Sequence, residues 1–157
     1  MIKAVFFDLG DTLVDEDNFE TLPYAHEVLK SLKEQRYKLA VVCDTEASKE
    51  EVKAIMRKAG ILEYFDVVVV SSEVGATKPN EKIFRVALDE LGLQPSEVVM
   101  VGNRISRDIL GGNQLGMRTI LIKWNSRYRE PITNPLEKPN FIIKTLAELI
   151  PILNKLE

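Results

Sequence analysis

The chain has 157 residues, of which 45% are hydrophobic and 29% charged, and its net charge is −3. This composition is typical of a globular domain, and the negative charge argues against a nucleic-acid or acidic membrane surface. Neither a membrane-spanning run nor a signal-peptide pattern is present, so we expect a cytoplasmic protein. Cys43 is the single cysteine, which excludes an intrachain disulfide, and a histidine-based triad would have to use His26.

Short apolar runs alternate with amphipathic stretches along the chain. The runs predict strands at residues 4–8, 37–42, 66–70, 97–101 and 117–122. A 3.6-residue apolar period predicts helices at residues 22–35, 48–59, 81–91 and 105–115. Residues 71–80 and 124–138 are expected loops, 140–143 a short edge strand and 145–156 a closing helix. The alternation predicts a single domain, residues 1–157, with a three-layer α/β/α fold around a parallel sheet of about five strands.

Polar side chains follow four of the predicted strands. They are Asp8, then Cys43 and Asp44, then Thr77 and Lys78, and finally Asn103 and Asp108. The carboxyl ends of parallel strands share one edge, so we expect these groups to converge. Two carboxylates, an amide and a lysine suit a divalent cation such as Mg²⁺ together with a substrate phosphate. The alternative is that they are unrelated turn residues, with the side chain of Asp8 merely capping its turn.

Four segments resemble the four motifs of the haloacid dehalogenase (HAD) superfamily. They are residues 7–14 (FDLGDTLV), 41–44 (VVCD), 75–79 (GATKP, followed by Ile83 and Phe84) and 101–109 (VGNRISRDI, followed by Gly111 and residues 115–117). The resemblance covers residues 1 to about 123. It implies a Rossmann-like fold with these motifs at the strand ends.

The resemblance also implies an activity, which is the Mg²⁺-dependent hydrolysis of phosphate monoesters. In that mechanism Asp8 attacks phosphorus to form an aspartyl-phosphate, which water then hydrolyses. Lys78 orients Asp8 and offsets charge, and the groups that contact the phosphoryl oxygens are Cys43, Asp44 and Lys78. The implied metal ligands are Asp8, the backbone carbonyl of Gly10, Asn103 and Asp108.

Several positions depart from the family's usual residues. Residue 10 is usually an Asp that protonates the leaving group, but here it is Gly10, and a general acid contributes roughly 10²- to 10⁴-fold in rate. Asp11 stands where Gly is usual, and we expect its side chain to project differently. Cys43 replaces Ser or Thr and is a weaker hydrogen-bond donor. Asn103 replaces Asp and lacks its charge. These degenerate motifs predict an altered or weak catalyst.

The chain has no room for the cap domain that family members acting on small metabolites usually insert. The resemblance then implies a capless enzyme acting on a large, even macromolecular, phosphorylated substrate, or a homo-oligomer in which another subunit lends a lid. Five cations near the same edge either steer an anionic substrate or form a solvated face: Arg104, Arg107, Lys123, Arg127 and Arg129. Trp124 and Tyr128 either line the site or pack against the sheet. The alternative function is a catalytically inactive HAD-fold protein that binds phosphate, metal or a partner.

Overall fold

The computed structural model describes residues 1–156. Its strands are β1 (Ala4–Phe7), β2 (Lys38–Cys43), β3 (Val67–Val70), β4 (Val98–Gly102), β5 (Arg118–Ile122) and β6 (Phe141–Ile143). Its α-helices are α1 (Ala25–Glu34), α2 (Lys49–Lys58), α3 (Ser71–Val74), α4 (Glu81–Leu91), α5 (Leu110–Leu115) and α6 (Leu149–Leu156). None of the helices within residues 1–156 is both long and apolar enough to cross a membrane.

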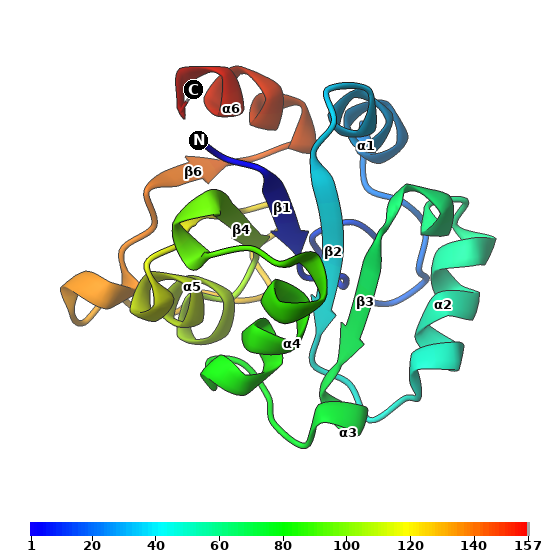
Figure 1. Cartoon of the computed structure of the whole chain (residues 1–157), viewed down its shortest axis with the longest axis horizontal. Helices are drawn as coiled ribbons and strands as arrows, with labels where there is room; N and C mark the ends of the chain where they lie inside the picture. The colour runs from blue at the N-terminus through cyan, green and yellow to red at the C-terminus, as the bar shows by residue number, and fades with distance from the viewer. Residues whose placement is uncertain (157) are drawn as a thin grey trace.

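All strand pairs of the sheet are parallel, and the spatial order is β3-β2-β1-β4-β5-β6 (Figure 1). β1 lies in the middle, with Phe7 level with Val41 of β2 and Val101 of β4. The chain moves outward from β1 to β3 on one side and then crosses to β4 on the other. The carboxyl end of β1 is therefore the point at which the strand order reverses, and this is where open α/β sheets bind ligands. The sheet has six strands because β6, the expected edge strand, joins the expected five.

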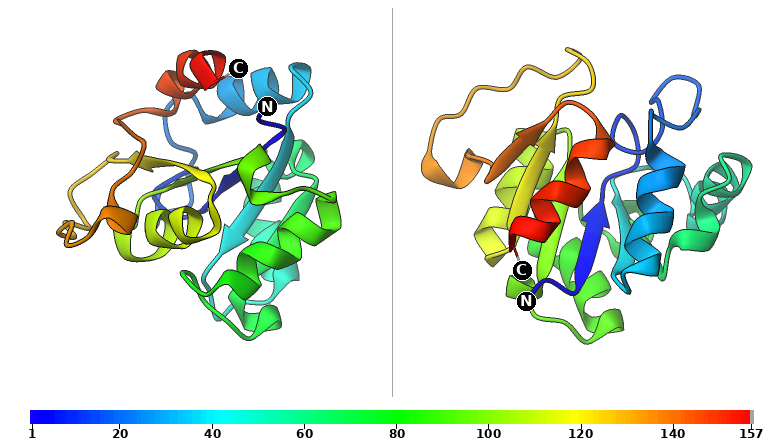
Figure 2. Two further views of the ribbon diagram at one scale, coloured as in Figure 1. Left: turned by 60° about the vertical axis from the view of Figure 1, so that its left-hand side comes forward. Right: turned by 90° about the horizontal axis from the view of Figure 1, so that it is seen from above.

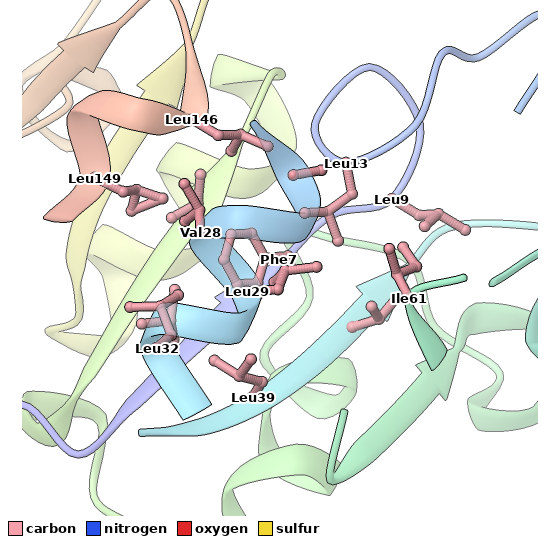
Figure 3. Close-up of a cluster of buried hydrophobic side chains, with 14 of the residues drawn as sticks. Phe7, Leu9, Leu13, Val28, Leu29, Leu32, Leu39, Ile61, Leu146 and Leu149 are labelled. Carbon is pink, nitrogen blue, oxygen red and sulfur yellow. The ribbon is translucent and has the colours of Figure 1, made fainter. Parts of the chain in front are cut away.

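Helices cover both faces of the sheet, which confirms the three-layer architecture (Figure 2). Successive residues of a strand point to opposite faces. Val5 and Phe7 of β1 therefore pack with residues of α1, α2 and α6, whereas Ala4 and Phe6 pack with residues of α4. In Figure 3 the labelled side chains of α1 lie against Phe7 and Leu39. Burying one such Leu or Phe contributes about 1.5–3 kcal/mol, so this packing holds the carboxyl end of β1 in place.

The helix boundaries differ from expectation where tertiary contacts intervene. α1 begins at Ala25 rather than residue 22, because Tyr24 has a φ of 69° and the Leu22 amide donates a hydrogen bond to the Leu13 carbonyl. The expected loop at residues 71–80 contains the one-turn helix α3, which ends at Gly75, where φ is 82°. The expected closing helix begins as a 3₁₀ turn, Leu146–Glu148, before α6.

The expected helix at residues 105–115 has two parts. Ile105–Ile109 form a π-helical segment, and α5 follows. The amides of Asp108 and Ile109 both donate hydrogen bonds to the Arg104 carbonyl, at 2.9 and 3.3 Å. Insertions of this kind in a helix are common at functional sites, and this one carries Asp108 beneath the end of β4.

Candidate active site

A cavity of about 320 Å³ lies at the carboxyl ends of β1, β2 and β4, and we call it the Asp8 cavity. It is lined by the sequence-predicted residues Asp8, Gly10, Cys43, Asp44, Lys78, Asn103 and Asp108. The convergence expected of the strand ends is therefore present in the fold. The parallel topology explains it, because each of these residues ends a strand or belongs to the segment that follows one.

Lys78 is the centre of the buried charge network. Its ammonium donates hydrogen bonds to Asp8 Oδ1 at 2.9 Å, Asp108 Oδ1 at 2.6 Å and the Val42 carbonyl at 2.7 Å. These three contacts use all the donors of the ammonium group. Burial opposes the charged form, but the charges of Asp108, Asp8 and Asp44 outweigh it and raise the pKa of Lys78 above its ordinary value. Lys78 is therefore a permanent positive charge that fixes one oxygen of Asp8.

Asp108 is fully buried, and both of its carboxylate oxygens already have partners. Oδ1 accepts from Lys78, and Oδ2 accepts from the Arg104 amide at 3.0 Å. Burial raises the pKa of this carboxyl, and the adjacent Lys78 opposes the rise. Gly102 makes the position possible, since a Cβ there would collide with the Asp108 carboxyl group. The geometry suits Asp108 to holding Lys78 in place.

Asp44 holds the loop that carries Lys78. Its Oδ1 accepts a hydrogen bond from the Lys78 backbone amide at 2.9 Å, and its Oδ2 lies 3.3 Å from Nη1 of Arg107. Arg107 also lines the Asp8 cavity, and its side chain is 42% exposed. Asp44 thus positions Lys78, which is buried, and Arg107, which is partly exposed. Arg107 has further donors with which to bind an anion.

Cys43 ends β2 and is buried with its thiol in the Asp8 cavity. Burial, reinforced by the negative charge of Asp8, raises the pKa of the thiol to about 12. The group therefore stays neutral at ordinary pH. Its Sγ donates only a weak bond, to the Asp44 carbonyl at 3.9 Å. A neutral thiol is a poor nucleophile, so the geometry gives Cys43 no nucleophilic role.

Two observations bear on whether the site suits Mg²⁺. Asn103 Oδ1 is a buried oxygen without a hydrogen-bond partner in the described part of the chain, and it lines the Asp8 cavity. Oδ2 of Asp8 also lacks a protein partner among residues 1–156. Free oxygens of this kind are what Mg²⁺ takes from a protein, alongside waters and substrate phosphate. Within residues 1–156 no cluster of three His, Cys, Asp or Glu side chains is poised to hold a metal. A cation here would therefore rely on Asp8, Asn103 and backbone carbonyl oxygen.

The turn after Asp8 separates two acids that are close in sequence. Asp11 has a φ of 55°, and its buried carboxylate accepts hydrogen bonds from the Glu16 amide and from Arg127 Nε at 2.9 and 2.8 Å. Burial opposes ionisation, but these bonds and one from Asn125 lower the pKa of Asp11. The Asp11 side chain lines a neighbouring cavity and not the Asp8 cavity. Asp11 therefore does not take the place of an acid at residue 10.

Sequence reasoning missed Glu16, which the acidic stretch 15–20 gave no reason to single out. Glu16 lines the Asp8 cavity, and its Cγ lies 3.6 Å from where a Cβ on Gly10 would be. Its carboxylate accepts a hydrogen bond from the Tyr128 hydroxyl at 3.0 Å, across 112 residues of sequence. Burial, followed by this bond, raises the pKa of Tyr128. Nothing local signals such a pair.

A second cavity, of about 460 Å³, adjoins the first, and we call it the Trp124 cavity. Asn103 and Tyr128 line both cavities. The expected polar loop supplies most of the new wall, including Trp124, and this loop leaves β5 as an arc in the right-hand view of Figure 2. Arg104 and Arg107 line the first cavity, and Lys123 and Arg129 the second. Four of the five cations of this edge therefore border the cavities, whereas Arg127 lines neither and pairs with Asp11, Glu16 and Asp17.

Comparison with known proteins agrees with the geometry. The family described as haloacid dehalogenase-like hydrolase matches residues 1–122, which hold β1 to β5 and every side chain of the Asp8 cavity except Tyr128. The chain belongs to this family. Its HAD fold is shared with the crystal structure of a HAD phosphatase from Thermococcus onnurineus, at a TM-score of 0.81, 24% identity and coverage of 97% of this chain and 98% of that one.

Relatives of this HAD chain include named phosphatases. It is 33% identical over 147 residues to pyrophosphatase PpaX of Bacillus cereus, and the alignment covers 94% of this chain and 63% of the relative. It is 38% identical over 128 residues to glyceraldehyde 3-phosphate phosphatase of Methanopyrus kandleri, covering 82% of this chain and 54% of the relative. The chain thus spans little more than half the length of these proteins.

Proposed function

We propose that this HAD chain is a Mg²⁺-dependent phosphohydrolase that cleaves phosphate esters through an aspartyl-phosphate on Asp8. The observation that carries the proposal is the fixed pair of Lys78 and Asp8. Lys78 holds Oδ1 of Asp8 at 2.9 Å, while Oδ2 has no protein partner in the described residues. A carboxylate fixed by one oxygen and free at the other is placed to attack an electrophile in the cavity.

The proposed reaction has two displacements at phosphorus. Oδ2 of Asp8 forms a bond to phosphorus as the bond to the leaving-group oxygen breaks, and that oxygen takes a proton from solvent water. A second water molecule then attacks phosphorus, loses a proton to solvent, and breaks the bond to Oδ2, which releases inorganic phosphate and the Asp8 carboxylate. Lys78 and Arg107 offset the negative charge of the phosphoryl group in a partly buried site, where such charges act strongly.

Bound Mg²⁺ would neutralise the phosphoryl oxygens and Asp8 as negative charge develops. Asp8, the Gly10 carbonyl and Asn103 would hold it, since the free oxygens of Asp8 and Asn103 border the same cavity. We propose no direct ligation by Asp108, because its two oxygens are bound to Lys78 and to the Arg104 amide.

The first experiment compares the protein with its Asp8→Asn variant on an activated aryl phosphate in the presence of Mg²⁺. Replacing a carboxylate nucleophile by an amide removes the covalent step, so we expect a loss on the order of 10³-fold or more in kcat. Glu34→Gln, the same change of carboxylate to amide at an exposed position of α1 outside both cavities, is the control. Activity that is absent from the unaltered protein, or equal in Asp8→Asn, would reject the proposal.

The rival function is a non-catalytic protein that binds phosphate, metal or a partner, and Gly10 favours it because no side chain there can protonate a leaving group. Gly10→Asp tests this point. The nearest atom to a Cβ at residue 10 is 3.6 Å away, which is ordinary contact, so the side chain fits. We expect roughly 10²-fold faster turnover of an alkyl phosphate and a smaller gain on an activated aryl phosphate. No gain of Gly10→Asp over the unaltered protein on the alkyl phosphate, or an equal gain on both esters, would count against a missing acid.

A broader part of the proposal concerns access to the site. We propose that the chain acts without a cap, as a single domain, in solution and on a phosphorylated substrate rather than on nucleic acid or a membrane. The short connection between β1 and α1, residues 8–24, supports this, because its turns border the cavity directly. Size-exclusion chromatography with light scattering would show whether a second copy is needed as a lid.

A further inference from the structure

The Trp124 cavity adjoins the site of the proposed reaction. It shares Asn103 and Tyr128 with the Asp8 cavity, and its volume of about 460 Å³ is within the usual range for a small-molecule pocket. Asn103 Oδ1, buried and without a partner in the described residues, lies at this junction. A substituent that extends from a phosphorus atom beside Asp8 therefore has a route, past Asn103 and Tyr128, into a second compartment.

The floor of the Trp124 cavity is apolar. Ile105, Leu121 and Ile122 form it, and all three are buried. Trp124 adds an indole wall and is 37% exposed, so part of its ring is accessible to a ligand. Apolar floors with aromatic walls bind flat or hydrocarbon bodies because contact with them releases water from both surfaces.

Two cations of the Trp124 cavity are unpaired. Its two acids already have cationic partners, since Asp11 pairs with Arg127, which Glu16 and Asp17 share, and Glu130 pairs with Arg104 at 3.2 Å. Its two cations, Lys123 and Arg129, are exposed, and their side chains have no hydrogen bond or ion pair to any described residue. Unpaired cations beside acids that already have partners attract an anion.

Contacts within the protein hold the wall of the Trp124 cavity in place. Arg127 ties the segment 125–128 to Asp11, and the Tyr128 hydroxyl bonds to Glu16. The Arg104 guanidinium stacks on the Tyr128 ring, 4.1 Å from its centre. These contacts join the segment to the turn after β1 and to the residues after β4, so binding does not have to order it first.

We propose that the Trp124 cavity is the subsite for the leaving group of the phosphate ester. It takes a leaving group with a flat or apolar body and a second anionic group, which Lys123 and Arg129 bind. The proposal rests on the proposed function, because it assigns the second half of that substrate. In this proposal, the loop after β5 selects the substrate by binding its leaving group beside Asp8.

The test compares phenyl phosphate with 4-carboxyphenyl phosphate, two esters that differ only by the added carboxylate. Both are assayed on the unaltered protein and on a Lys123→Ala/Arg129→Ala variant. Measuring both esters on each protein cancels their intrinsic difference in reactivity. We expect the ratio of kcat/KM, carboxylated ester over plain ester, to fall about fivefold or more in the variant, since exposed ion pairs are each worth a few-fold in binding.

The control is Lys30→Ala/Lys58→Ala, which removes the same charge from exposed positions of α1 and α2 outside both cavities. Its ratio should equal that of the unaltered protein. A ratio that is unchanged by the Lys123 and Arg129 substitutions, or that falls equally in the control, would overturn the subsite.

A second measurement separates failure of the subsite from failure of the proposed function. Trp124 is the only tryptophan, so its fluorescence reports on the cavity directly. If neither ester turns over, the activated aryl phosphate of the first experiment decides the phosphohydrolase proposal, and titration with 4-hydroxybenzoate decides the subsite. Quenching that saturates, and that needs about fivefold more ligand in Lys123→Ala/Arg129→Ala, supports it. Absent quenching, or equal quenching in both proteins, rejects it.

Discussion

Lys78 and Arg127 each bind several acidic groups, and they differ in how much water reaches them. The side chain of Lys78 is 1% exposed and pairs with Asp8 and Asp108. Arg127 is 35% exposed and pairs with Asp11, Glu16 and Asp17, at 2.8, 3.4 and 2.8 Å. Both cations have several acidic partners, but water reaches Arg127, Glu16 and Asp17 and weakens the pairs among them, whereas Asp11 is buried, as Asp108 is beside Lys78.

The difference separates two tasks within one site. A buried charge pair that loses one member leaves the other without water or a partner, so the Lys78 network must be complete. That suits a nucleophile whose position must not vary. The contacts of Arg127 with Glu16 and Asp17 can exchange with water at little cost, and the buried Asp11 keeps its bonds from the Glu16 amide and Asn125, which suits a wall that borders a substrate. Substitutions on the two sides should therefore differ in size and in their response to salt and pH.

The largest effect is expected for Lys78→Met, which removes the cation from between Asp8 and Asp108. Breaking a buried pair by removing one partner costs about 3–5 kcal/mol of the free energy of unfolding. Urea unfolding at pH 7 measures it. Lys82→Met, exposed at the start of α4, is the matched control and should change stability by less than about 0.5 kcal/mol. If Lys78→Met lowers the free energy of unfolding by less than about 1 kcal/mol, the network does not behave as a buried charge network.

An intermediate effect is expected from Cys43 at high pH. Its thiol pKa is raised to about 12, so the folded state keeps a proton that the unfolded chain, with a pKa near 8.5, releases. The contribution of the neutral thiol to stability is then fully present below about pH 8.5 and is lost as pH rises toward 12. At pH 10 the loss is about 2 kcal/mol.

The measurement is urea unfolding in EDTA at pH 7.5 and pH 10, with Cys43→Ala as reference. The unaltered protein should lose about 2 kcal/mol more than the variant between these pH values. Parallel losses would mean that the thiolate is tolerated beside Asp8.

The smallest effect is expected for Arg127→Ala. Exposed pairs contribute little, so we expect a fall of about 1–3 °C in Tm at low salt. The difference should shrink toward zero in about 1 M NaCl, where charges are screened within about 3 Å. Arg85→Ala, which breaks the exposed pair with Glu81 on α4, is the control. If Arg127→Ala lowers stability as much as Lys78→Met does, and salt does not change that loss, the distinction between the two networks is wrong.

Much of this molecule followed from its sequence. Apolar periodicity placed the strands and the amphipathic helices, because burial on one face or two leaves a direct mark on residue order. The helix at residues 81–91 has the expected ends, since Asn80 caps it and Gly92 closes it. The candidate site residues were found in the same way, by reading the polar residue that follows each strand, because parallel strands bring their carboxyl ends to one edge.

The sequence did not determine where the side chains at that edge point. Asp8 and Asp11 are three residues apart, yet a φ of 55° at Asp11 sends its carboxylate to Arg127 and into a different cavity. The bond between Glu16 and Tyr128 joins segments that share no local pattern. Turn geometry and long-range partners decide such directions, and only the tertiary structure fixes both. The sequence alone therefore determined which groups meet at the edge of the sheet, and the folded chain decided which of them face the nucleophile.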